Sequence, residues 1–265
     1  MFTLPTYKGP IMIVACSTLC FARHPLEKVF EFLTELDFTR FEVVVHDHSL
    51  HLQPDFAIDD PHRTSGYLKQ RPGILPSGFY YREVRRDLAR EISEVRNLAT
   101  LARHCQVPLI TVMPSSTIDF NTKENERFEA LLATTAREGV ELAVATHGGT
   151  WAAVPETLAS ACRHHKSLSV TLDPTHLPIL DLSADLQNLI FERVAHVHLR
   201  DSGKGPSQFQ TRVGKGQVEH GRILNLLERN GYQRLLSIDI HDIADSPFPV
   251  FPEVRKMKFL LESLL

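Results

Sequence analysis

The sequence predicts a (β/α)8 barrel, and three observations lead to this prediction. Short apolar runs rich in β-branched residues alternate with amphipathic segments along the chain, as expected for buried parallel strands connected by helices. Eight such runs occur over about 250 residues, which is the usual size of this fold. The stretch after the first run, 15–19, contains no glycine, whereas a doubly wound sheet would be expected to carry a glycine-rich phosphate turn there.

Each strand is predicted from a run of branched or bulky apolar residues, and each helix from apolar residues three or four positions apart. The predicted strands are 11–16, 41–46, 78–82, 108–113, 141–146, 168–172, 194–199 and 235–240. The predicted helices are 25–36, 84–104, 124–138, 155–165, 180–192, 219–230 and 250–264, with a weaker one at 57–71. No repeat or low-complexity run interrupts this order, so we expect a single domain over residues 1–265.

The composition is that of an ordinary folded protein, with 43% apolar and 23% charged residues among 265. A net charge of −3 without a dense Lys/Arg run weighs against a nucleic-acid partner, because phosphate-binding surfaces are basic. The four cysteines show no metal-binding spacing and are expected to be free thiols.

No membrane association is expected, because no apolar stretch approaches the ~18 residues of a membrane span. The run 11–15 before Cys16 is shorter than the core of a signal peptide, so we expect a cytoplasmic protein. The longest irregular stretch, 47–77, carries four prolines. Long loops in compact domains are often functional, and this one leaves a homo-oligomeric contact open.

Histidines and carboxylates gather where the predicted strands end. In a (β/α)8 barrel these ends meet at one mouth, which carries the reactive groups. A lone Asp or His at a strand end is more often a turn cap or an ordinary polar contact. The prediction of a metal site therefore rests on how many such residues gather there. Together they suit a divalent metal such as Mn, Zn or Co, acting as a Lewis acid. The residues are His46, Asp47, His48, His147, Asp173, His176, His196, His198, Arg200, Asp201, Asp239, His241 and Asp242.

Four stretches carry a resemblance to a known family. They read Leu-Asp-Pro-Thr-His at 172–176, His-Val-His-Leu-Arg-Asp at 196–201, Arg-Val-Gly-Lys-Gly at 212–216 and Leu-Ser-Ile-Asp at 236–239. In their order and spacing the chain resembles the xylose isomerase-like family of TIM barrels, which comprises sugar phosphate isomerases and epimerases together with the endonuclease IV branch. The resemblance covers nearly the whole chain and is weakest over 47–83.

The resemblance implies roles for several strand-end residues. Asp173 and His198 match metal ligands. Asp239 falls where the family has a metal-binding glutamate that also acts as acid and base. His176 matches a residue in contact with substrate or metal, and Arg212 matches a substrate-binding arginine.

The chain departs from the family pattern at two positions. The fifth-strand glutamate falls at Ala145, which can neither bind a metal nor transfer a proton, and the carboxylate of Asp239 is one methylene shorter. His147 could supply the missing ligand, since neutral imidazole binds transition metals, or it could contact the substrate from outside the metal shell. Glu42 is a further candidate for the substrate site, although an ion pair is equally open for it.

The resemblance implies a metal-dependent isomerase or epimerase of a small sugar or polyol, with Asp239 and His176 as catalytic groups. Ala145 opens two alternatives: a non-catalytic sugar-binding barrel with a degenerate metal site, or a lyase or dehydratase with a single base. The endonuclease branch fits less well, because the segment 208–212 lacks that branch's Asp-x-His ligands.

Overall fold

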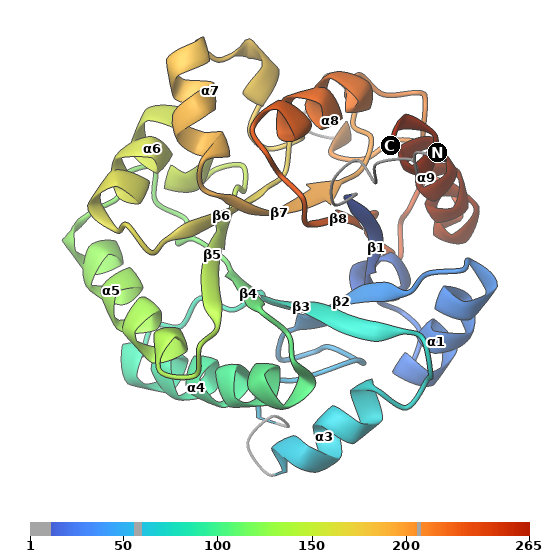
Figure 1. Cartoon of the computed structure of the whole chain (residues 1–265), viewed down its shortest axis with the longest axis horizontal. Coiled ribbons are helices and arrows are strands. Elements are labelled where there is room, and N and C mark those ends of the chain that lie inside the picture. The colour runs from blue at the N-terminus through green and yellow to red at the C-terminus, as the bar shows by residue number, and fades with distance from the viewer. Residues whose placement is uncertain (1–11, 56–59, 206–207) are drawn as a thin grey trace, which may run out of the picture.

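The computed structural model describes residues 12–55, 60–205 and 208–265. Over these ranges eight parallel strands form a closed barrel in the order of the sequence, and β8 pairs with β1 to complete the ring. Figure 1 shows the helices surrounding this ring. The predicted (β/α)8 barrel is therefore confirmed.

The strands lie close to their predicted positions. They are β1 (Ile13–Ser17), β2 (Arg40–Val45), β3 (Leu75–Tyr81), β4 (Leu109–Val112), β5 (Glu141–Ala145), β6 (Ser169–Leu172), β7 (Val194–Leu199) and β8 (Leu235–Ile238). The largest difference is in β3, which begins three residues before the predicted start at 78. Pro76 is tolerated near its beginning, where the register against β2 shifts between Phe41 and Glu42.

The helices also follow the prediction, with ends decided by capping side chains. They are α1 (Leu26–Glu35), α3 (Pro61–Leu68), α4 (Leu88–Cys105), α5 (Thr122–Ala136), α6 (Pro155–His164), α7 (Ala184–Phe191), α8 (His220–Arg229) and α9 (Val250–Leu264). α4 begins four residues later than predicted because Asp87 caps it, accepting from the Ala89 N–H, and Ser183 caps α7 in the same way. The stretch 47–77 contains α3, within the weaker helix predicted at 57–71, and residues 56–59 of this stretch lie outside the described residues.

The main apolar core lies between the strands and the surrounding helices, where residues such as Val43, Leu98 and Leu172 are fully buried. Leu19, Val44, Tyr80 and Ala145 form a second, smaller apolar cluster. None of the helices in the described ranges combines the length and the apolar character needed to cross a membrane.

Candidate active site

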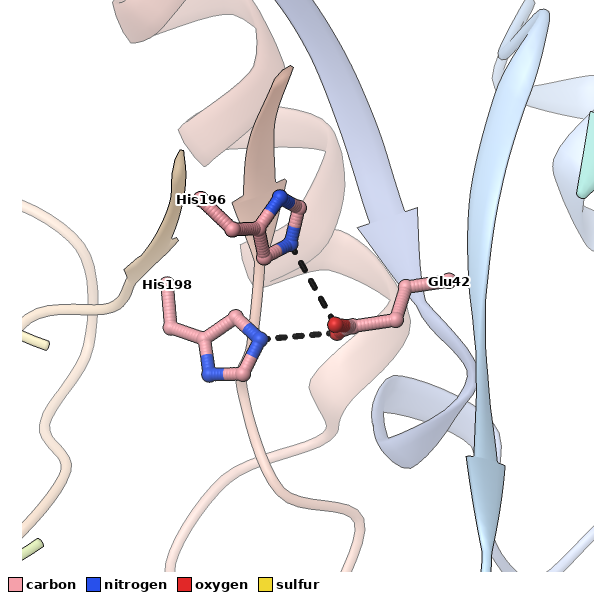
Figure 2. Close-up of side chains that lie close together, drawn as sticks. All are labelled: Glu42, His196 and His198. Atoms are coloured by element: carbon pink, nitrogen blue, oxygen red, sulfur yellow. Dashed lines mark hydrogen bonds and ion pairs between the residues drawn. The ribbon is translucent and has the colours of Figure 1, made fainter. Parts of the chain in front are cut away.

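A buried ion pair crosses the interior of the barrel. Glu42 on β2 lies 2.8 Å from His198 Nε2 through Oε2 and 3.3 Å from His196 Nε2 through Oε1. Because β2 and β7 are not neighbouring strands, these side chains meet inside the barrel, as Figure 2 shows. All three residues are at most 2% exposed. Of the two readings that the sequence left open for Glu42, these contacts favour the ion pair.

The ion pair controls the ionisation of both partners. Burial alone would raise the pKa of Glu42, but the neighbouring charges of His198 and His196 outweigh it and lower this pKa to about 2. Burial alone would lower the pKa of His198, but the charge of Glu42, followed by that of Asp239, raises it to about 9. At neutral pH a carboxylate therefore faces a protonated imidazole.

We expect the stability of the fold to fall on the alkaline side of neutrality. The raised pKa of His198 contributes stability that is complete below the ordinary value of 6.5 and is lost as the pH rises towards about 9. Urea unfolding, measured at intervals over this range, checks the prediction. A free energy of unfolding that stays constant from pH 6.5 to 9 would contradict it.

The guanidinium group of Arg200 lies between two strand-end carboxylates. Its Nη1 is 2.7 Å from Asp173 Oδ2 and 3.5 Å from Asp239 Oδ2. Its Nη2 is 2.8 Å from His176 Nε2, and its Nε–H donates to the carbonyl of Phe209 at 3.1 Å. Arg200 is only 1% exposed. It continues the alternation of His196 and His198 along β7, which places all three side chains on the inner face.

Asp201, just after β7, hydrogen-bonds the far end of the segment that follows this strand. Its Oδ2 accepts from the backbone N–H groups of Gly214 at 2.9 Å and Gly216 at 3.0 Å. A Cβ atom at Gly216 would lie 1.9 Å from Asp201 Oδ1, so this close approach requires glycine. The Asp201 carbonyl accepts from Thr211 at 2.8 Å. These contacts hold the segment that presents the Phe209 carbonyl to Arg200.

Asp239 and His241 form a dyad after β8, with His241 Nε2 3.0 Å from Asp239 Oδ2. Burial would raise the pKa of Asp239, but the charges of His241 and His198 lead the contributions that hold it well below its usual value. An ionised carboxylate can only accept a hydrogen bond, so Nε2 of His241 carries the proton. In the neutral ring Nδ1 then has a free lone pair. The His241 side chain is 18% exposed, which makes it the accessible member of the dyad.

His176 and His147 lie together, with their ring centroids 4.5 Å apart. Burial is the main cause that lowers the pKa of His176 to about 4, and Arg200 adds to it while Asp173 opposes it. Burial also lowers the pKa of His147, so both rings are neutral at pH 7. Because Arg200 can only donate, His176 accepts through Nε2 and carries its proton on Nδ1. His176 is thus a hydrogen-bond donor rather than a base.

The family positions that imply a divalent metal do not fit one here. The carboxylates of Asp173 and Asp239 face Arg200, and His198 Nε2 faces Glu42. At the fourth position Ala145 belongs to the apolar cluster with Val44 and Tyr80. His147, considered as a replacement ligand, points Nδ1 at the carbonyl of Gly148 at 3.0 Å. The two carboxylates and His198 Nε2 are thus directed at protein partners, while the hydrogen bond of His147 Nδ1 leaves Nε2 as its accepting nitrogen.

The trio of Glu42, His196 and His198 has the donor types of a metal site, and its ligand atoms lie within 4.8 Å of one another. Two imidazoles and a carboxylate suit transition metals. However, the Nε2 atom of His198 that would bind the ion already shares a proton with Glu42 at 2.8 Å. A divalent ion would have to displace this proton, so the trio fits a proton-linked ion pair better than a metal centre.

The structure brings most of the residues named from the sequence into one connected group. Contacts run from His147 through His176 to Arg200, then to Asp173 and Asp239. From Asp239 they continue to His198, 3.9 Å away, and on to Glu42. Arg212 has different neighbours: its guanidinium lies 3.4 Å from Glu253 of α9 and over the ring of Phe248.

Arg200 and His241 are central to this group, and the sequence placed both among the polar residues at the strand ends without giving either an individual role. Each lies two positions beyond a residue to which the resemblance assigned a role: His198 in one case and Asp239 in the other. Residues two apart on a strand share a face. This period, continued past the strand ends, predicts that Arg200 shares a face with His198 and that His241 shares a face with Asp239.

A family model described as xylose isomerase-like TIM barrel matches residues 26–258. No curated protein matches the sequence.

Solved structures with a similar fold include a xylose isomerase domain protein from Planctomyces limnophilus, at 17% identity over 96% of both chains with a TM-score of 0.71. A probable 3-DHS dehydratase from Bacillus anthracis matches at 14% identity over 93% of this chain and 98% of the other, with a TM-score of 0.70. A D-tagatose 3-epimerase-like protein matches at 17% identity over 96% and 98%, with a TM-score of 0.68. At such identities the likeness concerns the fold.

Proposed function

We propose that this chain, which belongs to the xylose isomerase-like TIM barrel family, is a single-base lyase that removes water from a small carbonyl compound derived from a sugar or polyol. The fold alone does not select a reaction, since an epimerase-like protein and a probable dehydratase both have it. The choice rests on the residues at the mouth of the barrel.

The observation that carries the proposal is the dyad of His241 and Asp239. The carboxylate holds the proton on Nε2 of the ring at 3.0 Å and leaves Nδ1 as the basic atom. A positioned imidazole of this kind is the commonest general base in enzymes. His176, the other candidate base named from the sequence, has its accepting nitrogen occupied by Arg200 at 2.8 Å.

The proposed step uses one base for two proton transfers. Nδ1 of His241 takes the proton from the carbon next to the carbonyl, and the electron pair of the broken C–H bond forms a carbon–carbon double bond. The C–O bond to the neighbouring hydroxyl breaks, and the imidazolium returns its proton to that hydroxyl, which leaves as water. His147 and the Nδ1–H of His176 are left to hydrogen-bond the oxygens of the substrate.

The isomerase or epimerase expected from the resemblance receives less support. In that family two carboxylates act on opposite sides of the sugar, and the position of the second is Ala145, which is 2% exposed in an apolar cluster. Inversion of a stereocentre needs a proton donor on the second face. No carboxylate is available from this position.

Incubation with a panel of small sugars, polyols and hydroxy-carbonyl compounds in D2O, followed by NMR, tests the proposal. Parallel incubations contain a chelator or Mn, Co or Zn. We expect an unsaturated dehydration product with one or more compounds, without inversion of the remaining stereocentres. An epimer or a shifted carbonyl would instead identify the isomerase activity. Binding without deuterium exchange or turnover across the panel would identify a sugar-binding barrel, and either result overturns the proposal.

A further inference from the structure

We propose that Arg200 is the permanent cation of the barrel mouth and that it occupies the place of a divalent metal between Asp173 and Asp239. The proposal concerns the cation and not the reaction. It can therefore fail while the proposed dehydration holds, and the reverse is also possible.

The two carboxylates require a cation because both are buried. Asp173 is 4% exposed and Asp239 is 2% exposed, and an ionised carboxylate removed from water is strongly unfavourable unless it is paired. Nη1 of Arg200 lies against Oδ2 of both, at 2.7 Å and 3.5 Å. A guanidinium group remains charged at every physiological pH. It can therefore neutralise the pair continuously.

The position of Arg200 is built into the fold. Besides the two carboxylates, it is held by the Phe209 carbonyl at 3.1 Å and His176 Nε2 at 2.8 Å. The Phe209 ring lies 5.8 Å from the guanidinium carbon. Asp201 in turn fixes the segment that carries Phe209, through the two glycine N–H groups. With partners on three of its nitrogens, the guanidinium cannot leave without breaking several charge-assisted hydrogen bonds.

A divalent ion would compete with Arg200 for the same oxygens. To bridge the two carboxylates it would need short contacts to ligand atoms, at about 2.0–2.2 Å, and Nη1 already contacts both Oδ2 atoms. It would also stand close to a fixed positive charge in a site of low dielectric, where repulsion between cations is strong. Ala145 supplies no further negative charge to offset this repulsion.

The first test measures metal binding to the wild-type chain. Protein treated with a chelator is titrated with Mn2+ by calorimetry, and the metal content after dialysis is measured by plasma mass spectrometry. We expect no saturable site that depends on Asp173. A stoichiometric site that disappears in Asp173→Asn but persists in the exposed-surface control Asp245→Asn overturns the proposal. A metal site that Asp173→Asn does not affect lies elsewhere in the chain. Such a result leaves the two carboxylates without a metal and supports the proposal.

The second test removes the charge of Arg200. In Arg200→Met, Asp173, Asp239 and the freed Nε2 of His176 become available as ligands, so we expect Mn2+ affinity to rise at least tenfold. Arg200→Lys, which retains a positive charge, is the matched control and should show no comparable gain. A folded Arg200→Met variant that binds Mn2+ no better than the wild type overturns the proposal. If this variant fails to fold, the wild-type titration still decides the question.

Discussion

Replacing Glu42 by glutamine is expected to lower the free energy of unfolding by about 3–5 kcal/mol, because removing one partner of a buried ion pair leaves an uncompensated buried charge. The charge left behind is that of His198, which is 2% exposed and loses its ion-pair partner at 2.8 Å. In the variant this imidazole can avoid the unpaired charge only by releasing its proton near neutral pH, and the pairing that raised its pKa to about 9 is lost in either form. The alkaline loss of stability expected for the wild type should then largely disappear.

Urea unfolding at pH 7 measures the effect, and the fluorescence of Trp151, the single tryptophan and fully buried, reports it. Glu35→Gln is the matched control. Glu35 forms an ion pair with Arg255 in which both side chains are more than half exposed, and exposed pairs contribute little. If Glu42→Gln unfolds within about 1 kcal/mol of this control, the interior ion pair is not a major source of stability.

The second large effect is expected on turnover. His241→Asn should reduce kcat by roughly 10²–10⁴-fold, the usual contribution of a general base, while KM changes little. Asp239→Asn should have a similar effect for a different reason. An amide at that position can donate to Nε2 of the ring, which forces the proton onto Nδ1 and removes the base.

The measurement is steady-state kinetics on the compound that the NMR panel identifies, together with deuterium exchange at the carbon next to the carbonyl. His164→Asn, an exposed histidine on α6, serves as the matched control and should retain full activity. Normal turnover in a folded His241→Asn variant would exclude this imidazole as the base. An unchanged unfolding curve shows that a loss of activity does not come from a damaged fold.

Much of the barrel could be predicted because its signals are local. Runs such as 41–46 and 194–199 are apolar over the length of a strand, and the structure places β2 and β7 there. Helix ends that depend on one capping side chain were predicted several residues away from their observed positions. The start of α4 after Asp87 is an example. Helix α3 was predicted only weakly, because its apolar pattern is poor and Asp60 and Pro61 determine where it begins.

The candidate site was predicted in part. Asp173, His198 and Asp239 were predicted because reactive groups in this fold lie at the ends of the strands. That prediction needs only the order of the strands and the residues at their ends. It could not say which side chains contact one another. The partner of His198 is Glu42, 156 positions earlier in the chain, and nothing in either local sequence indicates this pairing.

By itself the sequence determined the alternation of strands and helices, the family resemblance and the set of polar residues at the mouth. These follow from periodicity and from residue type at a known place along each strand. Only the tertiary structure decided that Arg200, rather than an imidazole or a vacant position, meets both carboxylates at the mouth. The physical reason is that charge compensation in a buried site depends on distances of a few ångströms between distant segments. Closure of the barrel sets those distances, together with the hydrogen bonds by which Asp201 holds the segment after β7.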